Sequence, residues 1–160
     1  MNHIHDIEIM APVGCWESLA AAIEAGATSV YFGIEHLNMR SRSSANFTTQ
    51  DLHTIVERCQ AVGVKTYLTL NTVMYPEDLP LMREIVNHAK AANVSAIIAS
   101  DIAALQYAYQ SGVEVHLSTQ LNIANTEALK FYAQYADVVV LARELNMDQV
   151  ASIYRDIIEQ

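Results

Sequence analysis

The stretch that decides the fold is residues 52–71, LHTIVERCQAVGVKTYLTLN. In its first half, apolar residues recur at the i, i+3, i+4 and i+7 spacing that predicts an amphipathic helix. These residues are Leu52, Ile55, Val56 and Cys59. Gly63 follows, and glycine ends helices because it adopts the left-handed conformation without strain. The second half, residues 64–71, is rich in β-branched and aromatic residues and predicts a strand.

The same unit recurs along the whole chain. Strand-like apolar runs alternate with amphipathic segments, and the runs are residues 7–11, 29–33, 64–71, 95–100, 113–118 and 137–142. Helix-ending residues precede several of these runs at Gly26, Gly63, Asn93 and Gly112. Two pairs, Thr48 with Asp51 and Asn146 with Gln149, have the spacing of helix capping boxes. Six strand–helix units in strict alternation predict an α/β fold with a parallel sheet.

Periodicity alone does not separate a barrel from an open, doubly wound sheet. The glycine-rich phosphate loops GxGxxG and GxxxxGK[ST], which favour an open sheet, do not occur in the sequence. A complete (β/α)₈ barrel takes about 250 residues. Six units in 160 residues therefore predict an incomplete TIM-type (β/α) barrel, with about six βα units of eight.

Composition and charge narrow the class of protein. Hydrophobic residues make up 52% of the chain and charged residues 17%, and the formal net charge is −9. This acidity argues against broad nucleic-acid binding, which needs a cationic surface, although local basic clusters remain compatible with it. No apolar run reaches the roughly 18 residues of a membrane span, and the first residues do not resemble a secretory signal. We expect a cytoplasmic protein, in which Cys15 and Cys59 act as small buried hydrophobes.

Polar residues gather where the predicted strands end. In parallel α/β folds the carboxyl ends of the strands carry the functional site. Three of the nine basic residues lie there, and a guanidinium group suits a carboxylate or a phosphate. We therefore predict an anion or substrate site at the barrel mouth, formed by Arg40, Arg42, Asn46, Asn71, Ser118, Gln120 and Arg143.

Three further residues are candidates for catalysis, and each has a structural alternative. His116, Ser118 and Gln120 alternate with apolar neighbours, which predicts that all three share one strand face toward the mouth. His116 is the first catalytic candidate, with a buried core histidine as the alternative. The other two are Asp101, alternatively a helix N-cap, and Glu144, alternatively a solvated ion pair with Arg143. No GxSxG elbow and no HExxH motif occurs, so the sequence predicts neither an activated nucleophile nor a metal site.

Five short motifs, in order along the chain, resemble those of one known family. They are MAPVG at 10–14, AGATSVYFG at 25–33, RSRSSANF at 40–47, HLSTQ at 116–120 and LAREL at 141–145. Together they are similar to the peptidase family U32, also called collagenase-like proteases, over residues 7–150. One departure is Cys15, because the family favours an aspartate or asparagine after the first glycine.

The resemblance implies a barrel whose mouth holds the matched residues. Family members are catalogued as peptidases or collagenases, while others take part in oxygen-independent hydroxylation of ribosomal RNA, transfer RNA or ubiquinone precursors. The latter carry an iron–sulfur cluster on cysteines that follow the matched region, and some RNA-modifying members draw on prephenate. Cys15 and Cys59 match no known cluster ligand. We therefore expect residues 1–160 to be the N-terminal part of such a barrel, without its closing strands and cluster-binding region.

Three hypotheses about function remain open at this stage. The first is hydroxylation of RNA or of a small aromatic substrate by the full-length protein. The second is proteolysis by a collagenase-like peptidase, and the third is a non-catalytic fragment that only binds an anion. The expected substrates are RNA, a prephenate-like carboxylate or a peptide. The 160 residues alone are expected to be inactive, and to self-associate because an unclosed barrel exposes two strand edges.

Overall fold

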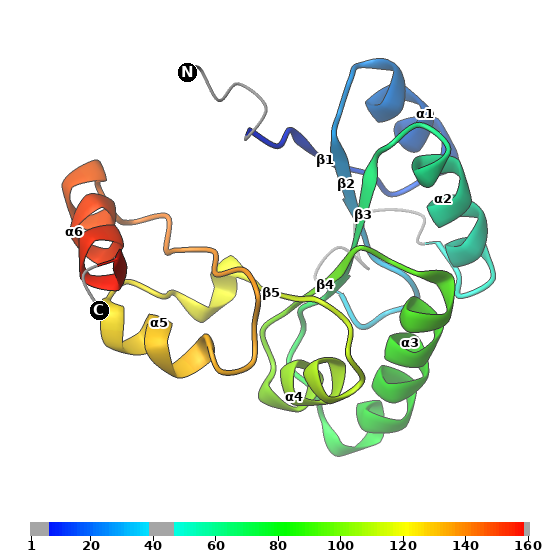
Figure 1. Cartoon of the computed structure of the whole chain (residues 1–160). Coiled ribbons are helices and arrows are strands. Elements are labelled where there is room, and N and C mark those ends of the chain that lie inside the picture. Colours follow the sequence, from blue (N-terminus) through cyan, green and yellow to red (C-terminus); the bar gives the residue numbers. More distant parts are fainter. Residues whose placement is uncertain (1–6, 39–46, 159–160) are drawn as a thin grey trace.

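A computed structural model describes residues 7–38 and 47–158, and its centre is one parallel sheet. Five strands are hydrogen bonded in chain order. They are β1 (Met10–Pro12), β2 (Ser29–Phe32), β3 (Lys65–Leu70), β4 (Ala96–Ala99) and β5 (Val115–Leu117). The sheet curves without closing on itself in the part of the chain described (Figure 1). This arrangement confirms the predicted TIM-type (β/α) barrel in incomplete form.

Helices follow the strands, and the first four cover the outer face of the sheet. They are α1 (Trp16–Glu24), α2 (Asp51–Gln60), α3 (Leu79–Ala92), α4 (Ile102–Gln110), α5 (Thr126–Tyr132) and α6 (Met147–Ile158), with the short 3₁₀ helices η2 (Pro76–Asp78) and η3 (Thr119–Leu121). Helices α1 to α4 lie along the outside of the arc, whereas α5 and α6 lie beyond β5 (Figure 1). The core fills the layer between α1–α4 and the outer face of the sheet, where the apolar stripe of α2 is fully buried. Burial of such a stripe is the main source of helix stability in proteins.

The predicted helix ends are confirmed, except that the capping box of Thr48 and Asp51 forms only in its Asp51 half. Gly26, Gly63, Asn93 and Gly112 all have positive φ angles, between 64° and 82°. The Asn146 amide nitrogen donates to Gln149 Oε1 and the Gln149 amide donates to Asn146 Oδ1, both at 2.9 Å. This reciprocal pair is a complete capping box at the start of α6. At the start of α2, the Asp51 carboxylate accepts hydrogen bonds from the backbone and the hydroxyl of Thr48, both at 2.8 Å.

The sixth predicted strand, residues 137–142, is wrong as a regular strand. Only isolated bridges occur there, joining Val138 to His116 and Leu141 to Ile123. The physical reason is that β5 ends at Leu117 and η3 then turns the chain. The residues between the two bridges consequently have no continuous partner on that side, and a ladder needs consecutive hydrogen bonds.

The two cysteines differ in how far they are buried, and this difference gives a first testable prediction. Cys59 on α2 is 0% exposed, and burial raises the pKa of its thiol to about 11. Cys15, before α1, is partly exposed. Because the thiolate is the reactive form, we expect iodoacetamide to modify Cys15 in the folded protein and Cys59 only after unfolding. Mass spectrometry of native and denatured samples measures this; rapid labelling of Cys59 in the native sample would contradict its burial.

Candidate functional site

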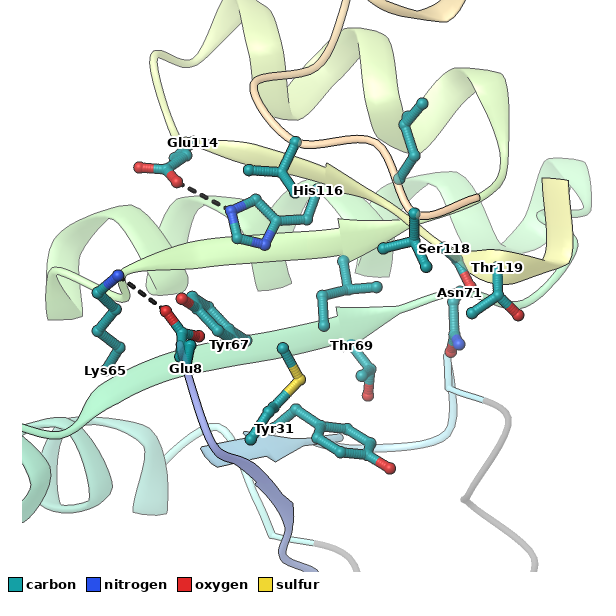
Figure 2. A pocket seen from close by; sticks show the side chains of 15 residues that line it. Glu8, Tyr31, Lys65, Tyr67, Thr69, Asn71, Glu114, His116, Ser118 and Thr119 are labelled. Atoms are coloured by element: carbon teal, nitrogen blue, oxygen red, sulfur yellow. Dashed lines mark hydrogen bonds and ion pairs between the residues drawn. The ribbon is translucent and has the colours of Figure 1, made fainter. Parts of the chain in front are cut away.

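The inner, concave face of the sheet carries a cavity of about 580 Å³. Side chains alternate along a strand, and each of the five strands contributes at least one side chain to the lining of the cavity. Figure 2 shows several of them, such as Tyr31, Tyr67 and His116. Tyr31 of β2 lies opposite Tyr67 of β3, and Ile98 of β4 lies opposite His116 of β5. The volume is within the range of about 300–1,000 Å³ that small-molecule sites occupy.

Five titratable residues gather in this cavity toward the amino ends of the strands. We call Glu8, Lys65, Tyr67, Glu114 and His116 the amino-end cluster (Figure 2). Lys65 Nζ lies 2.9 Å from Glu8 Oε2, and His116 Nε2 lies 2.8 Å from Glu114 Oε1. The rings of Tyr67 and His116 pack together with their centroids 4.8 Å apart. The cluster therefore joins β3, β5 and the segment before β1 across the concave face.

The protonation states of the cluster follow from its contacts. Burial raises the pKa of Glu8, but hydrogen bonding by Tyr67 and Lys65 lowers it more, so the pKa lies below its usual value. Burial also raises the pKa of the Tyr67 hydroxyl, and the nearby Glu8 and Glu114 carboxylates raise it further. Tyr67 thus remains a hydrogen-bond donor at neutral pH. With two carboxylates and one ammonium group, this end of the cavity does not favour an anion.

A pH-dependent contribution of Glu8 to stability is the second prediction. A carboxyl group with a lowered folded-state pKa stabilises the fold above its usual pKa, 4.5 here, and this contribution is lost as the pH falls through the lowered value. The pair with Lys65 is partly exposed, so we expect Glu8→Gln to cost less than about 1 kcal/mol at pH 7. Urea denaturation should show the gap between variant and parent closing below about pH 4. Glu127→Gln, in the exposed pair with Lys130, is the control; a gap for Glu8→Gln as large at about pH 3 as at pH 7 would refute the assignment.

The carboxyl-end mouth has a second, smaller cavity of about 370 Å³. The Ser100 hydroxyl donates to the Asn71 carbonyl oxygen and to Gln120 Oε1, both at 3.2 Å. Asp101 accepts hydrogen bonds from the Ala103 backbone at 2.8 Å and from the Met74 backbone at 3.1 Å. Asp101 is therefore the N-cap of α4 and also anchors the loop after β3. Both roles of the Asp101 carboxylate are structural.

The sequence-predicted residues separate into three groups. Asn71, Asp101, Ser118 and Gln120 meet at the carboxyl end, as expected. His116 and Ser118 line the large cavity, but Gln120 does not share their strand face because η3 begins at Thr119. The His116 ring also points toward Glu114 at the amino end rather than toward the mouth (Figure 2).

Of the three predicted arginines, the structure describes Arg143 alone, and it contributes to neither cavity. Arg143 and Glu144 are exposed and line neither cavity. Arg40, Arg42 and Asn46 lie outside the described residues, so their part in an anion site stays a prediction. On either side of these residues, Ile34 forms a bridge with Phe47, and Glu35 Oε1 accepts two hydrogen bonds from Thr49, each at 3.0 Å.

Sequence reasoning missed four members of the amino-end cluster: Glu8, Lys65, Tyr67 and Glu114. The available signal was alternation with period two, which places Lys65 and Tyr67 on one face of β3 and Glu114 on the face of His116. These residues do not lie at the carboxyl ends of strands, where sites are expected. Lys65 begins β3, and Glu8 and Glu114 precede β1 and β5.

Neither a metal nor an iron–sulfur site is formed by the described residues. Within residues 7–38 and 47–158, no group of three or more His, Cys, Asp or Glu side chains is arranged to hold a metal ion. An iron–sulfur cluster typically takes four cysteines, whereas this chain has two and Cys59 is buried in α2. These residues therefore do not fit a cluster. Over the same ranges, the helices are too short or too polar to cross a membrane.

The curved parallel sheet, its outer helices and its concave cavity define a protein of the TIM-type (β/α) barrel class. Residues 14–159 match the model of Peptidase family U32, and the chain belongs to that family. It is 65% identical over 156 residues to a collagenase of Porphyromonas gingivalis, covering 98% of this chain and 38% of the relative. It is 34% identical over 140 residues to tRNA hydroxylation protein P1 of Bacillus subtilis, covering 86% of this chain and 33% of that protein.

A solved structure supports the fold at the level of the backbone. The U32 peptidase Mk0906 superposes with a TM-score of 0.75 at 14% sequence identity, over 92% of this chain and 64% of that one. Similarity at this identity concerns the fold alone. The chain spans between a third and two fifths of the length of the curated relatives just described.

Proposed function

We propose that the whole protein takes part in hydroxylation of RNA, and that the concave cavity holds the base that is modified. The observation that carries the proposal is the cavity itself, whose walls are mainly apolar and include the aromatic rings of Tyr31, Tyr67 and His116. Enzymes that modify a base in RNA or DNA take it out of the stack into a closely fitting pocket. Such bases commonly stack on aromatic side chains. A relative named as a tRNA hydroxylation protein agrees with this proposal.

In this proposal, the charges at the two ends of the site determine which part of the RNA each end binds. The amino-end cluster has a surplus of carboxylates, so it accepts a neutral ring better than a phosphate. The RNA backbone would stay at the mouth, where Arg40, Arg42 and Arg143 are the candidate phosphate ligands. Because the chain carries a net charge of −9, backbone contacts would be confined to that end.

The described residues bind and orient in this proposal; they do not supply the oxidation. An iron–sulfur cluster, if present in the whole protein, would supply electron transfer and would be held by cysteines other than Cys15 and Cys59. The family resemblance adds that the reaction is independent of oxygen, and it leaves a small aromatic substrate as the alternative to RNA. A cytoplasmic location is a further part of the proposal and comes from the sequence. The cavity size suits either kind of ring.

Proteolysis is the second candidate, because the relative with 65% identity is named a collagenase. A peptidase needs an activated nucleophile or a metal-bound water. Between described residues, no serine, threonine or cysteine side chain is hydrogen bonded to a histidine; His116 pairs with Glu114, and His88 lies near Glu84. This geometry gives proteolysis less support than ring binding. A piece that binds an anion without catalysis is the third candidate.

Purification of the full-length gene product without oxygen separates these candidates. An iron–sulfur absorption spectrum with matching iron content supports hydroxylation. A colourless protein that cleaves denatured collagen, and loses this activity in the His116→Ala variant, would instead support proteolysis. A colourless protein without activity but with phosphate-dependent binding would support the third candidate.

We further propose that the 160-residue chain self-associates through its open edges. On the concave side, Met10, Val138 and Val140 are 43%, 41% and 38% exposed. In the part of the chain described, β1 and β5 are the two edge strands, and β5 is joined to the following chain only by the isolated bridge from His116 to Val138. Unpaired edges favour pairing with another chain, while the net negative charge opposes it. Light scattering should therefore show a mass above one chain that rises with added salt. A single-chain mass at high concentration and high salt would contradict this expectation.

A further inference from the structure

His116 is held on the concave face in one orientation. Its residue surface is only 7% exposed, and its ring packs on Tyr67 with centroids 4.8 Å apart. Nε2 lies 2.8 Å from Glu114 Oε1. Figure 2 shows the other ring nitrogen, Nδ1, directed away from Glu114 and toward the space above Tyr67. No described residue is hydrogen bonded to Nδ1.

The partner of Nε2 determines which nitrogen carries the proton. A carboxylate oxygen only accepts hydrogen bonds, so Nε2 must be the protonated, donating nitrogen. In a neutral imidazole the other nitrogen then carries a lone pair and no proton. Nδ1 is consequently an acceptor on the cavity side of the ring. In the same way, a carboxylate beside a histidine in many proteins fixes which ring nitrogen is protonated and how the ring is oriented.

We propose that Glu114 fixes neutral His116 in the Nε2–H tautomer, so that Nδ1 accepts a hydrogen bond from an N–H or O–H group on a planar ring bound in the concave cavity. Glu114 is a positioning residue and His116 is the group that touches the ligand. The nature of the ligand rests on the proposed function, whereas the tautomer does not.

The surroundings of His116 favour such a neutral, donating ligand. The charged groups that line the cavity with it, together with Tyr67, are Lys65 on β3, Glu8 before β1 and Glu114 directly before β5. Lys65 is paired with Glu8 at 2.9 Å, and Tyr67 keeps its proton and donates toward Glu8. These contacts leave Nδ1 as an acceptor that a ligand in the cavity can reach. Ile98, Val138 and other apolar side chains form the remaining walls.

Nitrogen-15 NMR of histidine-labelled protein tests the tautomer directly. At about pH 8, where histidine side chains are ordinarily neutral, two-bond correlation spectra should show His116 with a protonated Nε2 and an unprotonated Nδ1. Glu114→Gln should convert this pattern to a mixture of tautomers. Glu84→Gln, which removes the carboxylate 3.7 Å from His88, is the matched control and should leave the His116 signals unchanged. A protonated Nδ1 in the parent protein would overturn the proposal.

Phenol and its methyl ether, anisole, test the acceptor role. Phenol carries one O–H donor and anisole carries none, while their rings are alike. We expect phenol to shift the Nδ1 signal of His116 and to bind roughly ten- to a hundred-fold more tightly than anisole. His116→Phe should remove the preference while apolar binding remains. Equal affinities, or no effect of phenol on Nδ1, would overturn the acceptor role. Because these readouts need no RNA, failure of RNA hydroxylation would leave them unaffected.

Discussion

Gly33→Ala is expected to lower the free energy of unfolding by about 2–4 kcal/mol. Gly33 directly follows β2, and a Cβ atom there would overlap the side-chain amide of Asn38. Asn38 is 0% exposed, and its Nδ2 donates to the carbonyl oxygens of Ile34 at 3.2 Å and Glu35 at 3.3 Å. The overlap would displace this amide and leave buried polar groups unpaired. Urea denaturation followed by circular dichroism measures the loss.

Two further variants separate this steric effect from backbone strain. Gly63→Ala has open space around the new Cβ but a φ angle of +71°, so it should cost only about 1 kcal/mol. In the double variant Gly33→Ala with Asn38→Gly, the obstacle is gone. Its cost should then match that of Asn38→Gly alone, as a double-mutant cycle requires for a contact pair. Simple additivity of the two single changes would show that the Asn38 amide is not what excludes a side chain at residue 33.

Asp101→Ala is expected to cost about 2–4 kcal/mol, the sum of two separate losses. Removing an N-cap costs about 1 kcal/mol. The second loss is the hydrogen bond from the Met74 backbone at 3.1 Å, and hydrogen bonds to charged groups contribute about 1.5–3 kcal/mol. The first of these two losses is the 2.8 Å hydrogen bond from the Ala103 amide, which is the N-cap bond itself. Asp101→Asn retains one acceptor oxygen and should cost less than the alanine variant.

Asn125→Ala is the matched control for Asp101. Asn125 caps α5 by accepting a hydrogen bond from the Ala128 backbone at 2.8 Å, and that bond is exposed. Among the described residues, its side chain is hydrogen bonded to Ala128 alone and anchors no loop, so its loss should cost about 1 kcal/mol. Equal costs for Asp101→Ala and Asn125→Ala would show that the bond to Met74 adds no stability.

Local signals made most of the fold predictable from sequence. A residue such as Gly63 or Asn93 ends its helix because of its own backbone preference, and the Asn146–Gln149 box forms between neighbours in the chain. The apolar stripe of α2 is likewise visible within the helix sequence itself, and it requires only that the helix packs on a sheet. Residues 137–142 were different, because a strand exists only where a partner runs beside it. That partner, β5, is three residues long, and its length is not visible in residues 137–142 themselves.

The candidate site was less predictable because it depends on pairs distant in sequence. Lys65 meets Glu8 across 57 positions, and nothing local to either residue identifies the other. The orientation of the His116 ring depends on Glu114, two residues earlier, whose carboxylate is hydrogen bonded to Nε2 of the ring. For Asp101, the N-cap alternative was visible from sequence, while the bond to Met74 required the loop after β3. Alternation along β3 and β5 would have found the inward-facing set.

The most direct test of the central proposal is mass spectrometry of RNA from a strain that lacks the full-length gene. We predict that one nucleoside loses the mass of a single oxygen atom relative to the parent strain. The modification should return with the intact gene and fall at least tenfold with the His116→Phe variant. An unchanged set of RNA nucleosides in the deletion strain, together with collagen cleavage by the purified protein, would contradict hydroxylation and favour proteolysis.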